Sequence, residues 1–210
     1  MGDLSQLQVT LGPGPGAREA WHRGRPRYAV WLARIDAEPL RRRYFAAQTA
    51  LDGWIRTLPA LDAHLTVWVA GFPCQAPFYD DDVAEATLHA QAAVIARSPP
   101  LRVEIGGLRA FATAPYLEVR DLDGALGRLR DDLGQLGREQ RYSSYVPHIT
   151  VGSFTADWPV APILAAMAPL RAAPPIALTL SSVERVDLDA LREGAPLTTT
   201  QRVPLRQEPG

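Results

Sequence analysis

Apolar and polar residues follow two regular spacings along residues 27–205. Alternation or a short apolar, β-branched run predicts a strand, whereas apolar residues that repeat every three to four positions predict a helix. Strands are expected over 27–35, 63–70, 101–105, 115–119, 146–151, 176–186 and 198–205, and helices over about 37–57, 80–96, 122–136 and 159–170. A short strand is also expected over 7–11, before the Gly- and Pro-rich residues 12–16, which cannot hold regular structure.

Particular residue types support the ends of these helices. Asp36 is placed to cap the first helix, and Pro39 falls in its first turn, where a backbone N–H is not needed. The acidic run 80–82 is placed to cap the second helix. Leucines three and four residues apart predict the third helix despite Gly127 and Gly134.

The order of the expected elements predicts one α+β domain with an internal duplication. The 210 residues are enough for a single sizeable core or for two small lobes that share one. We expect an N-terminal extension over 1–26, a two-lobed domain over 27–205 and a tail over 206–210. Each half of the domain contains a strand, a helix and a strand that carries a similar four-residue motif, so two related lobes would place their motifs across a shared cleft.

That motif is the most informative feature of the sequence. His64-Leu65-Thr66-Val67 and His148-Ile149-Thr150-Val151 repeat the same pattern of histidine, apolar residue, threonine and apolar residue, 84 positions apart (148 − 64). Two such matches among four histidines would arise by chance about once in a thousand sequences. Alternation along a strand sends the histidine and the threonine to one face. Each copy therefore presents an imidazole and a hydroxyl together.

Composition limits the class and the compartment of the protein. The chain is 47% hydrophobic and 21% charged, and it contains no apolar run of the roughly 18 residues that a membrane span needs. The first residues lack the basic and apolar regions of a secretory signal, and the single Cys74 cannot form an internal disulfide. We therefore expect a cytoplasmic monomer with no membrane partner.

The charge distribution argues against duplex DNA as a partner. All 22 basic residues are arginine, but the formal net charge is −1. A protein that neutralises many phosphates carries a basic stripe, and the one basic run, residues 41–43, falls on an expected helix and is interpreted as a solvated face. A nucleotide or the terminus of an RNA strand is a better ligand for such a protein than a long polymer.

Two imidazoles that face one another suit a reaction that moves two protons, because one can start neutral and the other charged near pH 7. Phosphoester cleavage has this requirement, and the hydroxyls of Thr66 and Thr150 could donate hydrogen bonds to the phosphate oxygens. This scheme needs no metal and no cofactor. A metal site is disfavoured because two histidines need further ligands, and Asp62 is the one candidate ligand that adjoins a motif histidine.

The paired motifs, with this spacing and this order of strands and helices, resemble the two-histidine (2H) phosphoesterase superfamily, and within it the bacterial RNA 2′,3′-cyclic phosphodiesterases, also called 2′,5′-RNA ligases. The similarity covers about residues 27–205. It implies two pseudo-symmetric lobes, each an antiparallel sheet with helices on its outer face, around a V-shaped cleft. It also implies hydrolysis of a cyclic phosphate to a 2′-phosphomonoester, with His64 as proton donor, His148 as proton acceptor and Thr66 and Thr150 binding phosphate.

Other interpretations remain open from the sequence. Many bacterial relatives have an arginine shortly after the second motif, whereas this chain has Gly152-Ser153-Phe154, so the substrate could instead be another cyclic oligonucleotide or ADP-ribose cyclic phosphate. A non-catalytic nucleotide-binding module and an RNA-binding scaffold are the non-enzymatic alternatives. His22 and His89 are interpreted as incidental. Five aromatic residues flank the motif strands and could stack a base or pack in the core: Phe72, Phe78, Tyr142, Tyr145 and Phe154.

Overall fold

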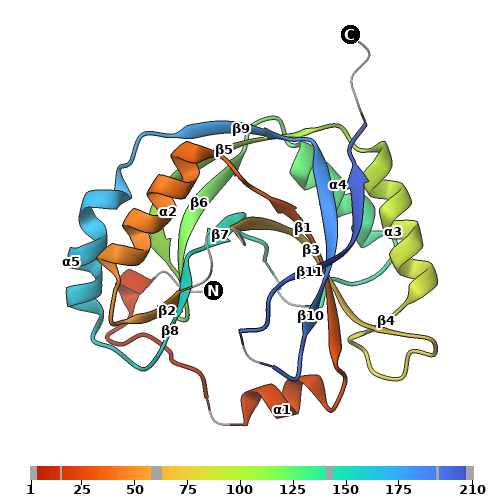
Figure 1. Ribbon diagram of the computed structural model, residues 1–210, viewed down its shortest axis with the longest axis horizontal. Coiled ribbons are helices and arrows are strands. Elements are labelled where there is room, and N and C mark those ends of the chain that lie inside the picture. Colours follow the sequence, from red (N-terminus) through yellow and green to blue (C-terminus); the bar gives the residue numbers. More distant parts are fainter. Residues whose placement is uncertain (1–3, 15, 58–62, 141–143, 193, 207–210) are drawn as a thin grey trace.

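The computed structural model describes residues 4–14, 16–57, 63–140, 144–192 and 194–206, which form two lobes (Figure 1). The first lobe is built on a five-stranded sheet in the order β11-β10-β1-β3-β4. Its pairings are antiparallel except for β3 with β4, which are parallel. The strands are β1 (Arg27–Arg34), β3 (His64–Cys74), β4 (Asp82–Ala84), β10 (Ser182–Asp189) and β11 (Thr198–Pro204).

The second lobe is built on a four-stranded antiparallel sheet in the order β7-β6-β5-β9. Its strands are β5 (Leu101–Ala110), β6 (Pro115–Asp121), β7 (His148–Thr150) and β9 (Ile176–Leu180). A further antiparallel pair joins β2 (Ile55–Thr57) to β8 (Gly152–Phe154). The expected α+β class with two sheet-based lobes is confirmed.

Helices lie on the outer sides of the two sheets (Figure 1). On one side α3 (Glu85–Arg97) packs against β3 and β11, beside α4 (Ala125–Gly134); on the other side α5 (Val160–Arg171) packs against β5, beside α2 (Glu38–Ala50). The leucine spacing of α4 places Leu126, Leu129 and Leu133 in the core, as the periodicity predicts. The largest buried cluster draws residues from both lobes, so the two sheets share one core.

The first helix is shorter than the sequence pattern predicts. It ends at Ala50 rather than near residue 57, because Gly53 takes a positive φ of 83° in a turn and β2 then pairs with β8. The residue at its N-cap is Ala37, with no side-chain cap, and Asp36 instead forms an ion pair with Arg41. Pro39 does occupy the first turn.

The acidic run 80–82 does not cap a helix. Asp82 begins β4, and α3 starts only at Glu85 with Ala84 at its N-cap. Asp82 Oδ2 instead accepts hydrogen bonds from the backbone N–H groups of Phe78 and Tyr79, both at 2.9 Å. The Asp82 carboxylate therefore organises the turn between β3 and β4.

The strand expected over 176–186 is two strands in different sheets. It breaks at Ser181, whose carbonyl accepts the Leu205 N–H at 2.9 Å, so that β9 pairs with β5 and β10 pairs with β1. The apolar positions change parity at this break, from Leu178 and Leu180 to Val183, so the alternation does not run through it. The helix expected over 122–136 and the second motif strand expected over 146–151 are likewise shorter, at Ala125–Gly134 and His148–Thr150.

The N-terminal extension contacts both lobes. Residues near Thr10 bind the segment before α5: the Thr10 N–H donates to Trp158 O at 2.9 Å, and the strand expected over 7–11 is reduced to a single bridge between Val9 and Pro159. A helix that was not predicted, α1 (Ala17–His22), places Trp21 against the buried rings of the first sheet. Among the described residues, no helix is long and apolar enough to cross a membrane.

Arg25 holds the end of this extension against the first lobe through ion pairs with Asp81 at 2.5 Å and Asp82 at 2.6 Å. Burial alone would raise the pKa of Asp82, but hydrogen bonds from Tyr79 N–H, Phe78 N–H and Arg25 outweigh it and lower the pKa. A lowered folded-state pKa means that the carboxylate stabilises the fold above its ordinary pKa, near 3.9. This stabilisation is lost as the pH falls through the folded-state value.

We expect Asp82→Asn to lower the free energy of unfolding at neutral pH by about 1–3 kcal/mol, since it leaves two amide donors and Arg25 without their charged acceptor. The urea midpoint of the parent should fall between about pH 5 and pH 3, and that of the variant should fall less. Asp80→Asn, at an exposed position of the same run, serves as the control and should behave like the parent. Equal acid sensitivity in parent and Asp82→Asn would contradict this assignment.

Candidate active site

The structure places the two motif strands beside one another. β3 belongs to the first sheet and β7 to the second, and Cα atoms of the two strands approach within 8 Å (Figure 1). In both motifs the apolar residues are buried in the core, whereas the histidine and threonine are half-buried. The alternation predicted from the sequence therefore directs His64, Thr66, His148 and Thr150 away from the core.

Backbone and aromatic contacts orient His148. Its Nδ1 lies 2.7 Å from the carbonyl oxygen of Val146, and in a neutral ring this bond assigns the proton to Nδ1 and the lone pair to Nε2. The ring also packs edge-on against Phe111 and Tyr116, with centroid distances of 5.0 and 5.4 Å. A neutral His148 held in this way has the tautomer that a general base needs if Nε2 faces the substrate.

His64 lies at the start of β3, opposite Arg34 of β1. The Arg34 side chain bonds to the buried carboxylate of Glu184 at 3.1 Å, and Arg202 reaches the other oxygen of that carboxylate at 3.0 Å. Thr199 donates to Glu184 as well, at 2.8 Å. Two guanidinium groups thus share one carboxylate on the sheet face that carries the first motif, which favours an anionic ligand there.

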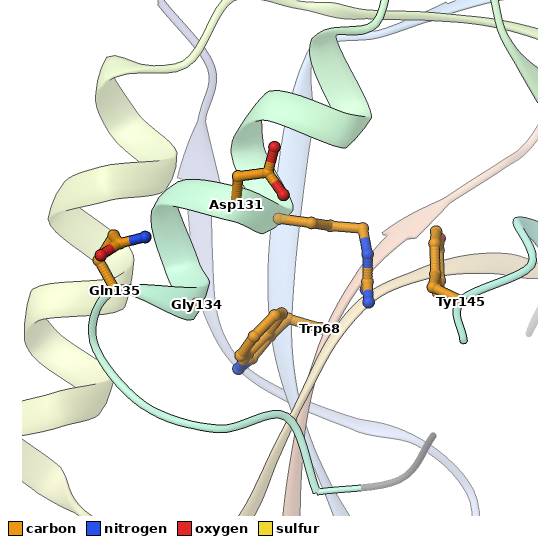
Figure 2. A pocket seen from close by; sticks show the side chains of 6 residues that line it. Trp68, Asp131, Gly134, Gln135 and Tyr145 are labelled. Carbon is orange, nitrogen blue, oxygen red and sulfur yellow. The ribbon is translucent and has the colours of Figure 1, made fainter. Parts of the chain in front are cut away.

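One cavity lies apart from the motif residues. It has a volume of about 490 Å³ and is lined by residues of α4, by Trp68 of β3 and by Tyr145 (Figure 2). The guanidinium carbon of Arg130, on α4, lies 3.4 Å from the ring centroid of Tyr145 and 5.4 Å from that of Trp68. No motif histidine or threonine lines this cavity, so its size does not make it the reaction centre.

The aromatic residues considered from the sequence lie in different environments. Phe72 and Phe154 are buried in the core, and Phe78 is 84% exposed on the turn after β3. Tyr145 is packed against Arg130, and Tyr142 lies outside the described residues. Sequence reasoning missed Phe111 and Tyr116, which stack at 4.1 Å beside His148. Only strand register could have found them, because Tyr116 lies opposite Thr150.

The remaining predicted features do not join the motifs. His22 accepts the Gly24 N–H on Nδ1 at 2.9 Å, and His89 is exposed on α3. In the basic run, Arg41 pairs with Asp36 and Glu38, whereas Arg43 bonds to carbonyl oxygens of β5. Within the described part of the chain, no three His, Cys, Asp or Glu side chains gather as metal ligands would. Asp62 lies outside that part.

Gly152 directly follows the second motif, at a point where β2 and β8 approach closely. A Cβ atom here would lie 2.7 Å from the carbonyl oxygen of Arg56, so the backbone approach requires glycine.

A sequence model described as the 2′-5′ RNA ligase superfamily matches residues 34–191, a range that includes both motifs. The chain belongs to this superfamily.

Solved structures support the same fold for this superfamily member. E. coli LigT in apo form is 17% identical with a TM-score of 0.61, and the match covers 88% of this chain and 100% of LigT. LigT complexed with 3′-AMP matches with the same identity and TM-score over 87% of this chain and 99% of LigT. The protein TT0787 of Thermus thermophilus is 18% identical with a TM-score of 0.57, over 86% and 99%. No curated protein matches the chain. These identities establish a shared fold, and the family assignment supports phosphoester chemistry.

Proposed function

We propose that the protein is a metal-independent phosphodiesterase that hydrolyses a 2′,3′-cyclic phosphate, at an RNA terminus or on a small nucleotide, to a 2′-phosphomonoester. The observation that carries this proposal is the meeting of β3 and β7, which brings two histidine–threonine motifs together from different sheets. Family membership and the matched LigT structure with 3′-AMP support a nucleotide as the ligand.

In the proposed reaction, His148 acts as the base. Its Nε2 removes a proton from the attacking water while a bond forms between the water oxygen and phosphorus. The bond from phosphorus to the 3′ oxygen breaks, and His64, initially charged, gives its proton to that oxygen. Thr66 and Thr150 donate hydrogen bonds to the two non-bridging oxygens. The products are a 3′-hydroxyl and a 2′-phosphate, and the two histidines end in exchanged protonation states that solvent restores.

The decisive experiment is incubation of the purified protein, in chelator, with 2′,3′-cyclic nucleotides, cyclic dinucleotides, ADP-ribose cyclic phosphate and RNA ending in a 2′,3′-cyclic phosphate. Product analysis should show a 2′-phosphomonoester from a 2′,3′-cyclic substrate. If only another cyclic substrate is hydrolysed, the proposed substrate class is wrong and the proposed two-histidine chemistry is retained. Tight nucleotide binding without turnover of any panel member would overturn the proposed enzymatic activity and favour a nucleotide-binding module.

The rate should rise and then fall with pH, since the base must begin neutral and the acid must begin charged. We expect kcat/KM to pass through an optimum at roughly pH 5.5–8. Activity should persist in EDTA because neither proton transfer needs a metal. A profile that climbs steadily through about pH 9, or loss of activity in EDTA that zinc or manganese restores, would exclude this mechanism.

A further inference from the structure

Both motif strands have an open edge where they carry the threonines. β7 is the outermost strand of the second sheet, and β3 meets β4 only at Phe72–Cys74, beyond its motif. Val67 has no register partner on β1 either, because a bulge falls between the pairs Trp31–Trp68 and Leu32–Thr66. Backbone carbonyls on such edges need partners from elsewhere in the chain.

Side chains from the second half of the chain supply these partners for β3. The Tyr145 hydroxyl donates to the carbonyl oxygen of Thr66 at 2.6 Å, and the Arg130 guanidinium donates to that of Val67. Arg130 is itself held by an ion pair with Glu139. Glu139 also accepts the Val69 N–H at 3.2 Å. Burial raises the pKa of Tyr145, so its hydroxyl remains protonated and able to donate.

Side chains from the first half make the equivalent pair of bonds to the second motif. The Tyr44 hydroxyl donates to the carbonyl oxygen of Thr150 at 3.1 Å, and Gln48 Nε2 donates to that of Val151 at 3.1 Å. Tyr44 and Gln48 lie one turn apart on α2, so both reach the same strand edge. Tyr44 is fully buried. In both motifs, therefore, a tyrosine hydroxyl binds the threonine carbonyl, and the amide or guanidinium group of a second side chain binds the next carbonyl.

We call each pair of donors a clamp: Tyr145 with Arg130 on the first motif, and Tyr44 with Gln48 on the second. Each clamp comes from the half of the chain opposite to the motif that it binds. Tyr44 follows β1 but holds the motif of the second half, whereas Tyr145 precedes β7 but holds the motif of the first half. Tyr145 is also adjacent to Val146, whose carbonyl orients His148. Each clamp thus fixes one motif relative to an element of the other half. The separation and direction of two catalytic groups on different sheets require such a constraint.

We infer that Tyr44 and Tyr145 are positioning residues of the reaction, each acting through the threonine whose carbonyl it binds. This inference rests on the proposed function. Fixing the peptide of Thr66 or Thr150 fixes the direction of its hydroxyl toward the phosphate. Loss of one tyrosine hydroxyl should therefore weaken transition-state binding by the threonine of the opposite half and leave the other threonine unaffected.

Crossed double-mutant cycles test this inference. Tyr145→Phe and Tyr44→Phe keep the ring and remove the donor, and each should lower kcat about threefold to tenfold with a smaller change in KM. In a Thr66→Val background the effect of Tyr145→Phe should shrink below about twofold, whereas in a Thr150→Val background it should persist. Tyr44→Phe should show the reverse dependence. A purely structural role would give the same effect in both backgrounds.

The matched control is Tyr28→Phe, at a buried tyrosine in a separate apolar cluster of the first sheet. It should leave kcat unchanged in every background even if it lowers the urea midpoint. Gln48→Met removes the second donor to the β7 edge and provides another variant if Tyr44→Phe does not fold. It should show the same dependence on Thr150, by a smaller factor.

The failure of this inference differs from failure of the proposed function. Additive effects in all four tyrosine–threonine combinations, in a parent that turns over a cyclic phosphate, would overturn the clamps alone. If the parent shows no turnover, the same cycles are measured as calorimetric affinities for 2′-AMP, and crossed coupling there would retain the clamps in a binding protein. Neither turnover nor 2′-AMP binding in the parent would overturn the proposed function and this inference together.

Discussion

Replacement of His64 or of His148 by alanine is expected to lower kcat/KM for the cyclic substrate by about 10²-fold or more. Each substitution removes one of the two groups that transfer protons, and each general acid or base contributes typically 10²- to 10⁴-fold. Both side chains are directed away from the core, so the variants should retain the fold. The measurement is steady-state kinetics on the best substrate, beside circular dichroism of each variant.

His89→Ala is the matched control because His89 is exposed on α3 and belongs to no motif. It should retain the parent rate. A folded His64→Ala or His148→Ala protein that keeps more than about a third of parent turnover would disprove the two-histidine mechanism. The double variant should be little worse than the poorer single variant, since residues that act as a unit in one step are not additive.

Much of the fold follows from residue spacing alone. The alternation of β6 and the leucine spacing of α4 predicted both the element types and the buried faces, because each pattern matches a single repeat of the backbone. The errors have a common cause in tertiary pairing. Residues 55–57 form a strand because β8 pairs with them, and the 176–186 pattern is divided because its two parts pair with different sheets. Such partners are not encoded in local periodicity.

For the candidate site, too, the sequence predicts some of the residues and not others. Repetition of a four-residue motif identified His64, Thr66, His148 and Thr150, and the half-buried positions of all four agree with the predicted strand parity. The residues that support these four could not be found, since they are distant in sequence and contact the backbone rather than motif side chains. Tyr44 is an example, because its partner Thr150 lies 106 positions further along the chain and nothing in the helix pattern marks the bond.

The crossing of the clamps also bears on the duplication. In each half, a helix that precedes the motif strand in sequence binds the motif strand of the opposite half: Tyr44 and Gln48 donate from α2, and Arg130 donates from α4. Either half alone would leave these motif carbonyls without their described donors. The two halves therefore stabilise one another's motifs, which is consistent with one shared core.

Substitution of the motif threonines by valine should lower activity by roughly 10- to 150-fold, the equivalent of one hydrogen bond to a charged group worth about 1.5 to 3 kcal/mol. Valine keeps the shape and strand propensity of threonine and removes only the hydroxyl. If Thr66 and Thr150 follow the phosphate into its transition state, part of the loss must appear in kcat rather than only in KM.

The threonine prediction is measured as kcat and KM for Thr66→Val and Thr150→Val, with nucleotide affinity determined by calorimetry. Thr179→Val is the matched control, since Thr179 is an exposed strand threonine on β9, at the opposite edge of the sheet from β7. If both motif variants keep the full activity of the parent, the threonines do not bind the phosphate. Losses confined to KM would assign them to ground-state binding of the phosphate. A loss shared between kcat and affinity is the expected result, because a hydroxyl that binds the phosphate in both states should bind it more strongly as charge develops on the non-bridging oxygens.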